Sequence, residues 1–189
     1  MIVHLLGFPG VGKSTIARAL VAHANSAGVR LVVVDNHQTS NVVLEVVEAD
    51  GVQALPTGVW ERVAEIREIQ YRSIEELSPP DWSFAFTNVL VESDPMSPIV
   101  IARLTKLASA RSTRYVPVIV RCNPVELRRR VSSPDRVGRH KWIDPDAVEA
   151  FARSEQLLRP PDLTIDVDVT ELSIDESART VWELVSSRS

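Results

Sequence analysis

Residues 7–14 read Gly7-Phe8-Pro9-Gly10-Val11-Gly12-Lys13-Ser14 and satisfy the phosphate-binding pattern GxxxxGK(S/T) at every fixed position. The apolar run at residues 2–6 predicts a buried strand before this loop, and residues 15–20 start a helical pattern after it. This order of strand, glycine-rich turn and helix N-terminus is the context that the motif requires, and it argues against an ordinary glycine turn. The glycines allow backbone N–H groups to surround a phosphate, and the helix dipole adds to their field. The sequence therefore predicts binding of a nucleoside triphosphate.

The loop supplies most of the expected nucleotide contacts. Lys13 would reach the β- and γ-phosphates with its ammonium group, and the hydroxyl of Ser14 would ligate Mg²⁺. We therefore expect ATP and Mg²⁺ as cofactors, with Lys13 also taking part in catalysis. The loop residues expected to bind the nucleotide are Gly7, Pro9, Gly10, Val11, Gly12, Lys13, Ser14 and Thr15.

Length and composition limit the class of protein. The chain has 189 residues, 44% of them hydrophobic and 24% charged, which fits one globular domain over residues 1–189. The net charge of −4 gives no general attraction to nucleic acid or to an anionic membrane, and no apolar run approaches the roughly 20 residues of a membrane-spanning helix. A single cysteine, Cys122, excludes an intrachain disulfide. Because the first strand begins at once, we expect no signal peptide and hence a cytoplasmic protein, a monomer or homodimer without nucleic-acid or membrane partners.

Apolar runs alternate with helical patterns along the chain, which is typical of an α/β fold with a parallel sheet. Further strands are expected at residues 30–35, 84–91, 115–120 and 163–168. Pro117 has no backbone donor, so its place in a strand suggests an irregularity or a sheet edge. Cap residues that begin helices are expected at Ser97, Asn123, Asp144 and Ser173.

Two long segments separate the strands. Residues 36–80 are too long for a loop and predict two helices, and they hold eight acidic residues against three arginines. Residues 121–142 hold seven arginines and lysines against two acids. A solvated basic helix face could account for this second excess, but a concentration of arginine also suits the binding of phosphate groups.

The whole layout resembles the small P-loop kinases, the group that contains shikimate kinase, gluconate kinase, chloramphenicol phosphotransferase, adenylylsulfate kinase and the nucleoside monophosphate kinases. The resemblance covers nearly the full chain. It rests on the phosphate loop, on Asp35 at the end of the second strand, on the arginine-rich stretch from residue 125 to Arg139, and on the Asp168-Val169-Thr170 turn. It implies a three-layer α/β/α P-loop NTPase fold with five parallel strands in the order 2-3-1-4-5. It also implies an acceptor-binding insertion at about residues 36–80 and a lid at about residues 125–143.

Arginines of the basic segment are candidates for contacts with the transferred phosphate. Phosphoryl transfer requires mainly positioning and positive charge around the γ-phosphate. We expect Arg136 and Arg139 to be catalytic groups that move in with a lid. Neighbours on a helix cannot all face one way, so one arginine of residues 128–130 could lie over the adenine or contact phosphate while the others are solvated. We assign Arg129 to the nucleotide site, together with Thr170.

Asp35 is the candidate general base and acceptor ligand. A carboxylate at the C-terminal end of a strand lies in the crevice where α/β sheets bind ligands, and it could accept the proton of an acceptor hydroxyl there. The alternative role is to cap the following turn through Asn36. His37 could help to bind the acceptor, although a loop histidine is more often merely exposed.

The metal site and the pocket walls have weaker signals. Glu92 and Asp94 follow the third strand in the manner of a Walker B element, and either could hold Mg²⁺ through water. Solvation in a loop is the alternative for both. Trp60, Trp82 and Trp142 could line an acceptor pocket or pack in the core.

The acidic balance of residues 36–80 favours a neutral or cationic acceptor, such as a sugar, nucleoside or antibiotic. The expected function is therefore transfer of the γ-phosphate of ATP to a hydroxyl group of such a small molecule. The alternatives are a nucleotide kinase and a P-loop NTPase or ATP-binding regulatory protein without a small-molecule acceptor. The sequence has no Asn-Lys-x-Asp motif, which excludes a GTPase, and an AAA-type motor would need more chain for its helical lid domain.

Overall fold

Five strands build a single parallel sheet in the computed structural model, which describes residues 1–50, 53–136, 142–160 and 164–187. The strands are β1 (Ile2–Leu6), β2 (Leu31–Asp35), β3 (Ser83–Asn88), β4 (Tyr115–Arg121) and β5 (Ile165–Asp168). They lie in the order β2-β3-β1-β4-β5, and every pair of neighbours is parallel. The expected α/β class and the strand order 2-3-1-4-5 are confirmed.

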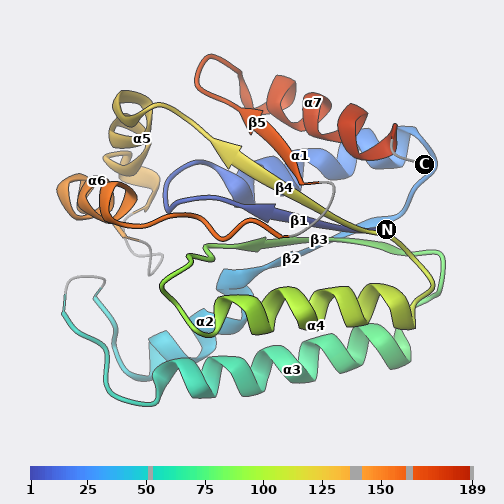
Figure 1. The fold of residues 1–189 in the computed structure, drawn as a ribbon, viewed down its shortest axis with the longest axis horizontal. Coiled ribbons are helices and arrows are strands. Elements are labelled where there is room, and N and C mark those ends of the chain that lie inside the picture. The colour runs from blue at the N-terminus through green and yellow to red at the C-terminus, as the bar shows by residue number, and fades with distance from the viewer. Residues whose placement is uncertain (51–52, 137–141, 161–163, 188–189) are drawn as a thin grey trace.

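Helices cover both faces of the sheet, as the three-layer fold requires (Figure 1). On one face lie α1 (Lys13–Ser26) and α7 (Ile174–Ser186), and on the other lie α3 (Val59–Leu77) and α4 (Ser97–Ala110). The shorter helices follow the carboxyl ends of strands: α2 (Asn36–Val46) follows β2, and α5 (Pro124–Val131), the 3₁₀ turn η1 (Pro134–Arg136) and α6 (Pro145–Ser154) follow β4. This arrangement places most connections that could form a site at one end of the sheet.

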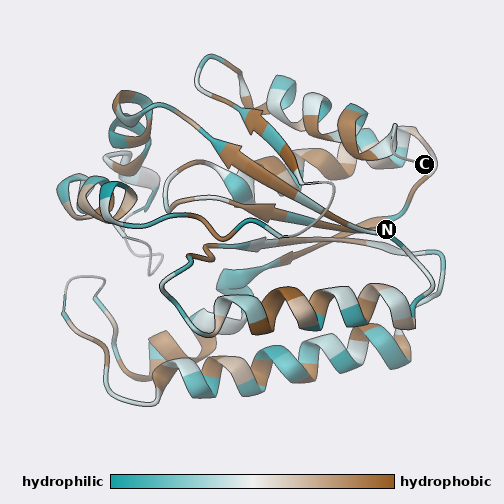
Figure 2. Ribbon diagram, viewed as in Figure 1, coloured by the Kyte–Doolittle hydropathy of each residue, from teal (hydrophilic) through white to brown (hydrophobic). Residues whose placement is uncertain are grey.

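The apolar strands form the core because a parallel sheet covered on both sides buries both of its faces. Val3 and Leu5 of β1 pack in a cluster with residues of α1 and α7, whereas Ile2 packs in a second cluster with residues of α3 and α4. Figure 2 shows the strands as mostly hydrophobic between helices of mixed hydropathy. His4, on the same face as Ile2, is the polar residue of β1 and is fully buried. None of the described helices combines the length and the apolar composition needed to cross a membrane.

Two details of the strands differ from the expectation. β3 ends at Asn88 rather than at residue 91, and Val91 instead forms an isolated antiparallel bridge with Leu157. Pro117 does not lie on a sheet edge, because β4 has β1 on one side and β5 on the other. It is accommodated there because the pairing with β5 begins only at Val118, so β5 requires no hydrogen bond from position 117.

Most helix starts follow the cap chemistry of the sequence. Asn123 accepts a hydrogen bond from the backbone of Glu126, Asp144 caps α6, and Ser173 forms a complete capping box. Ser97 does not cap α4. The cap position is Met96, and the Ser97 hydroxyl accepts from the backbone N–H of Val91 at 3.1 Å, where it joins the two ends of the turn after β3.

Candidate nucleotide and acceptor site

The phosphate loop has the backbone conformation that its glycines allow. Gly12 is the cap residue of α1, and its φ of 103° lies in the left-handed region that favours glycine. Gly10 has a φ of 92°, and a Cβ atom there would lie 2.5 Å from Cγ2 of Val131. Within the described residues no side chain caps α1, so its first backbone N–H groups stay available to an anion.

The side chains of Lys13 and Ser14 are held close to the loop. Nζ of Lys13 donates to the carbonyl oxygens of Gly7 at 2.7 Å and Phe8 at 2.9 Å. The Ser14 hydroxyl donates to Oδ2 of Asp35. The ammonium group expected to contact phosphate and the hydroxyl expected to contact Mg²⁺ therefore lie at one end of the sheet with a carboxylate beside them.

A cavity of about 700 Å³ extends from the loop to the segment expected to bind the acceptor. Two of the loop residues expected to bind the nucleotide lie away from this cavity. Val11 is buried in the core, and Gly7 lies against β4, where a Cβ atom would be 2.6 Å from the carbonyl oxygen of Val120. Farther along, the wall is formed by residues of α2, α3 and α4 and by the segment around α6. The loop residues on the cavity wall are Pro9, Gly10, Gly12, Lys13, Ser14 and Thr15.

Asp35 lies on the cavity wall between the phosphate loop and the start of α2. It is 2% exposed and accepts hydrogen bonds from Ser14, from Oγ1 of Thr87 at 2.9 Å and from the backbone N–H of His37 at 3.3 Å. Burial by itself would raise the pKa of Asp35, but these hydrogen bonds outweigh it and lower the pKa below its ordinary value. The carboxylate is therefore ionised at neutral pH. It also caps α2, through His37 rather than through Asn36, so both roles considered for it are compatible with its position.

The oxygen atoms of Ser14 and Asp35 are the best candidates for a magnesium site. Mg²⁺ prefers oxygen ligands, keeps several waters and takes further oxygens from the phosphates of its substrate, so a hydroxyl and one carboxylate beside the loop fit it. Asp94 lines the cavity, but its carboxylate accepts from the backbone of Met96 at 3.0 Å and from Ser97 at 3.3 Å. Glu92 is exposed and is not among the described residues of the cavity wall. Because β3 ends at Asn88, neither acid directly follows a strand.

The arginines of the basic segment have different environments. Arg136 lines the cavity and donates from Nε and Nη2 to the carbonyl oxygen of Trp142, at 3.1 and 2.8 Å. Arg139, the other expected lid arginine, lies outside the described residues. Arg129 has a side chain that is 73% exposed and forms two hydrogen bonds with Glu126. The lid at about residues 125–143 stays a prediction.

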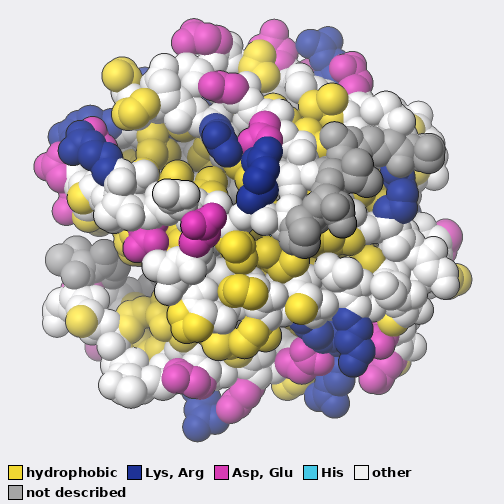
Figure 3. Space-filling model, in the orientation of Figure 1, with side chains coloured by type: hydrophobic (Ala, Val, Ile, Leu, Met, Phe, Trp, Pro, Cys, Tyr) yellow, Lys and Arg dark blue, Asp and Glu magenta, His cyan; other side chains and the backbone are white. Residues whose placement is uncertain are grey.

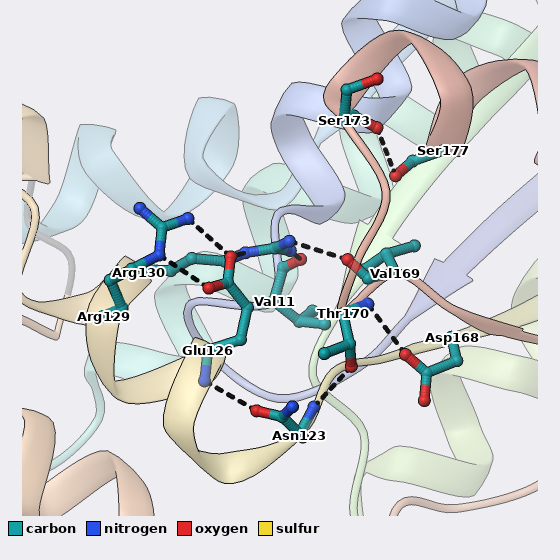
Figure 4. A network of polar contacts seen from close by, with 10 residues as sticks. All are labelled: Val11, Asn123, Glu126, Arg129, Arg130, Asp168, Val169, Thr170, Ser173 and Ser177. Carbon is teal, nitrogen blue, oxygen red and sulfur yellow. Dashed lines mark hydrogen bonds and ion pairs between the residues drawn. The ribbon is translucent and has the colours of Figure 1, made fainter.

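Arg130, rather than Arg129, contacts the phosphate loop (Figure 4). Its Nη1 donates to the carbonyl oxygen of Val11 and its Nη2 to that of Val169, both at 2.8 Å. Its Nε donates to Glu126 at 2.6 Å, the i,i+4 spacing at which a helix pairs charges. Thr170 lies in the same network, where its hydroxyl accepts from the backbone N–H of Asn123 at 2.9 Å. Arg130 thus ties α5 to the loop and to the turn after β5, a role that the sequence analysis missed although the spacing from Glu126 was visible.

Arg67 on α3 is the second residue that the sequence analysis missed. It lines the cavity and donates to Oδ1 of Asn36. Val63 lies four residues before it and Tyr71 four residues after it, and both are buried. A helix places residues at this spacing on one face, so the sequence contained a signal for an inward-facing arginine.

The expected aromatic residues divide between the cavity and the core. Trp60 and Trp142 line the cavity. Trp82 is partly buried against the core cluster that includes residues of α3 and α4, and the guanidinium of Arg30 lies 5.3 Å from its ring centroid. Cys122 is half-buried, and burial raises the pKa of its thiol, which does not favour a nucleophile.

Comparisons with known proteins agree with this geometry. A family model, AAA_18, described as an AAA domain, matches residues 3–144. Thymidylate kinase from Candida albicans is similar in structure, with 13% identity, a TM-score of 0.63 and coverage of 99% of this chain and 91% of that chain. A gluconokinase from Sinorhizobium meliloti 1021 has 14% identity, a TM-score of 0.60 and coverage of 98% and 91%. The APS kinase of Mycobacterium tuberculosis, in complex with AMPPNP and APS, has 15% identity, a TM-score of 0.58 and coverage of 98% and 96%.

A comparison with curated protein sequences finds no match. The similarity covers nearly all of this chain and nearly all of each solved kinase. It therefore concerns the whole fold rather than the phosphate loop alone. The small P-loop kinase group expected from the sequence is therefore confirmed as the structural group of this protein. The chain belongs to the AAA_18 family and has the fold of the small P-loop kinases.

Proposed function

We propose that this protein is an ATP-dependent kinase that transfers the γ-phosphate of ATP to a hydroxyl group of a small molecule. The observation that carries the proposal is one continuous cavity that joins the phosphate loop to the walls of α2, α3 and α4, with the Asp35 carboxylate between the two parts. The solved structures of similar fold support it, since they include a gluconokinase and an APS kinase in complex with AMPPNP. Nucleotide phosphorylation and a regulatory ATPase remain the alternatives.

In the proposed reaction ATP lies along the loop with its γ-phosphate toward Asp35. The acceptor oxygen forms a bond to the γ-phosphorus, the bond from that phosphorus to the β,γ-bridging oxygen breaks, and ADP leaves with the electron pair. Asp35 accepts the proton of the acceptor hydroxyl. Lys13 and Arg136 stabilise the charge on the transferred group. Mg²⁺, held through Ser14 and Asp35, would neutralise phosphate charge when bound.

The charge of the acceptor cannot be taken from the composition of residues 36–80. Of the eight acids in that segment only Glu68 lines the cavity, and it forms an ion pair with Arg103 at 2.9 Å. The argument for a neutral or cationic acceptor therefore loses its basis, whereas the hydroxyl acceptor itself remains part of the proposal. The cytoplasmic location and the monomeric or homodimeric state stay predictions.

ATP turnover with a panel of hydroxyl compounds, in the presence of Mg²⁺, tests the proposal. We expect slow hydrolysis without an acceptor and a clear stimulation by one chemical class of acceptor. Lys13→Ala should abolish transfer or weaken AMPPNP binding, while Lys106→Ala, an exposed lysine of α4, should change neither. Equal activity of the two variants would contradict the assignment of the loop.

A further inference from the structure

The cavity wall formed by α2, α3 and α4 carries several large apolar side chains. Three of its large apolar side chains are well exposed: Trp60 by 57%, Met96 by 48% and Ile99 by 56%. Figure 3 shows hydrophobic side chains gathered at the surface over the N-terminal half of α4. Leu44, Val63 and Val100 continue this apolar wall. Because a polyhydroxylated compound would leave these side chains without apolar partners, the wall fits an acceptor with an apolar body.

One corner of the same wall is positively charged. Arg67 forms its hydrogen bond with a neutral amide, that of Asn36, and no carboxylate of the described residues forms an ion pair with it. The neighbouring Arg103 differs, because it forms ion pairs with Glu68 at 2.9 Å and with Glu75 at 3.1 Å. Both arginines line the cavity. Among the described residues, carboxylates compensate the charge of Arg103 but not that of Arg67, so Arg67 is the better candidate to pair with an anionic ligand.

Tyr71 adds a buried donor to this corner. The residue is 4% exposed and lines the cavity, and within the described part of the chain its hydroxyl has no hydrogen-bond partner. A buried hydroxyl without a hydrogen-bond partner lowers the stability of the fold. An oxygen atom of a ligand that accepts its hydrogen bond would remove this cost. Burial raises the pKa of Tyr71 to about 12, which keeps the hydroxyl protonated as a donor.

A chain of buried and partly buried side chains holds Asn36 in position for Arg67. Oδ1 of Asn36 also accepts from Nδ2 of Asn88 at 3.3 Å, and Oδ1 of Asn88 faces Nε2 of His4 at 2.9 Å. Nδ1 of His4 lies 2.8 Å from the hydroxyl of Tyr115. Since an amide oxygen only accepts, Nε2 of His4 is the donor and its Nδ1 accepts from Tyr115. This hydrogen-bond chain from the core fixes the Asn36 amide, which in turn orients the guanidinium of Arg67; a precise binding site requires such support.

We propose that the acceptor is a hydroxyl compound with an apolar body and one anionic group, either a carboxylate or a phosphate. This inference rests on the proposed kinase function. The anionic group pairs with Arg67 and accepts from the hydroxyl of Tyr71. The apolar body packs against Trp60, Met96 and Ile99, and the hydroxyl that receives the phosphate reaches Asp35.

Binding of matched probes tests the charged corner without relying on catalysis. The probes are 4-(2-hydroxyethyl)benzoate, its uncharged primary amide, the corresponding aryl phosphate and gluconate, each titrated by calorimetry in the presence of AMPPNP and Mg²⁺. We expect the aromatic anions to bind more tightly than the amide and gluconate, and the preferred anion distinguishes carboxylate from phosphate. Arg67→Gln should weaken anion binding by about 10- to 100-fold, since a hydrogen-bonded charge is lost. It should change amide binding by less than about 3-fold.

Three further variants separate recognition from folding. Arg67→Lys should recover part of the affinity, because it keeps the charge. Tyr71→Phe removes only the hydroxyl and should weaken anion binding by about 3- to 10-fold with unchanged thermal stability, since that hydroxyl makes no bond within the described protein. Arg62→Gln is the matched control, because this arginine of α3 is 68% exposed and pairs with Glu65. AMPPNP affinity should be unchanged in all of them.

The outcomes distinguish the two proposals. Anion binding that depends on Arg67, without any stimulation of ATP turnover, would support the site and contradict the kinase function. Phosphoryl transfer that proceeds equally well to gluconate or to the amide, and equally well in Arg67→Gln, would support a kinase and overturn the acceptor class. Binding of the anionic probes that is equal in wild type, Arg67→Gln and Tyr71→Phe would also overturn it.

Discussion

Replacing Arg130 with methionine tests whether the hydrogen bonds of this α5 side chain stabilise the phosphate loop. Arg130 is 20% exposed and donates to the carbonyl oxygens of Val11 and Val169, residues that are 2% and 0% exposed (Figure 4). Methionine keeps much of the apolar stem but removes every donor. The two carbonyl oxygens would lose a charged partner in a place that water reaches poorly.

The size of the effect follows from these two bonds. A hydrogen bond to a charged donor contributes about 1.5–3 kcal/mol, and partial exposure reduces that value, so we expect a loss of about 2–4 kcal/mol in the free energy of unfolding. With a urea m-value of about 2–3 kcal/mol/M, the unfolding midpoint should fall by about 1 M. Arg129→Met is the matched control, because Arg129 bonds to the same Glu126 but is 73% exposed. Its replacement should lower stability far less, because solvent screens an exposed ion pair.

The assay is urea unfolding followed by circular dichroism, together with calorimetric titration of AMPPNP. Arg130→Met should lower both stability and nucleotide affinity, because Val11 belongs to the loop, while Arg129→Met should leave nucleotide affinity unchanged. Equal midpoints for the two variants, or a larger loss for Arg129→Met, would refute the reasoning and return Arg129 to consideration as the nucleotide-binding arginine.

Three further predictions concern the site and the core. Asp35→Asn should leave AMPPNP affinity measured without Mg²⁺ nearly intact and lower phosphoryl transfer by about 10²- to 10⁴-fold, the usual effect of losing a general base; full recovery at raised Mg²⁺ would show that Asp35 serves the metal alone and would contradict its role as the base. Arg136→Ala should lower kcat more than it weakens ATP binding, because its charge acts on the transition state, and near-wild-type kinetics would leave it a surface residue. The pKa of His4 is lowered to about 4 by burial, so the unfolded chain binds more protons between pH 6.5 and 4 and stability falls as pH decreases through that range. Unfolding at pH 7 and 5 should differ by about 2 kcal/mol from this residue alone, and His4→Gln should flatten the profile to that extent.

The phosphate loop and the sheet could be predicted from the sequence because their signals are local. The motif at residues 7–14 constrains the backbone through its glycines, and the apolar runs of the strands reflect burial on both faces. The cap residues Asn123 and Ser173 act on atoms three positions away, so they too are visible in the sequence.

The end of β3 could not be predicted in this way. Residues 89–91 are as apolar as the strand before them, so composition predicts that the strand continues to residue 91. The two strands that pair with β3 end earlier: β2 ends at Asp35, opposite Thr87, and β1 ends at Leu6, opposite Asn88. With no strand left to pair with on either side, the chain leaves the sheet, and Glu92 and Asp94 lie on a turn that continues into α4. Strand ends of this kind depend on sheet register, which the sequence of one strand does not contain.

The charge of the acceptor pocket shows the same dependence on geometry at the level of single side chains. The sum over residues 36–80 is acidic, but solvent screens charges on the outer faces of α2 and α3, and the pocket responds mainly to the charges that line it. On that wall Glu68 forms an ion pair with Arg103, whereas the partner of Arg67 among the described residues is an amide. The helical phase of α3 separates these cases, because Arg67 shares the buried face of Val63 and Tyr71. The electrostatic character of a site therefore has to be read from the helix face that forms it, and here that face favours an anionic group on the acceptor.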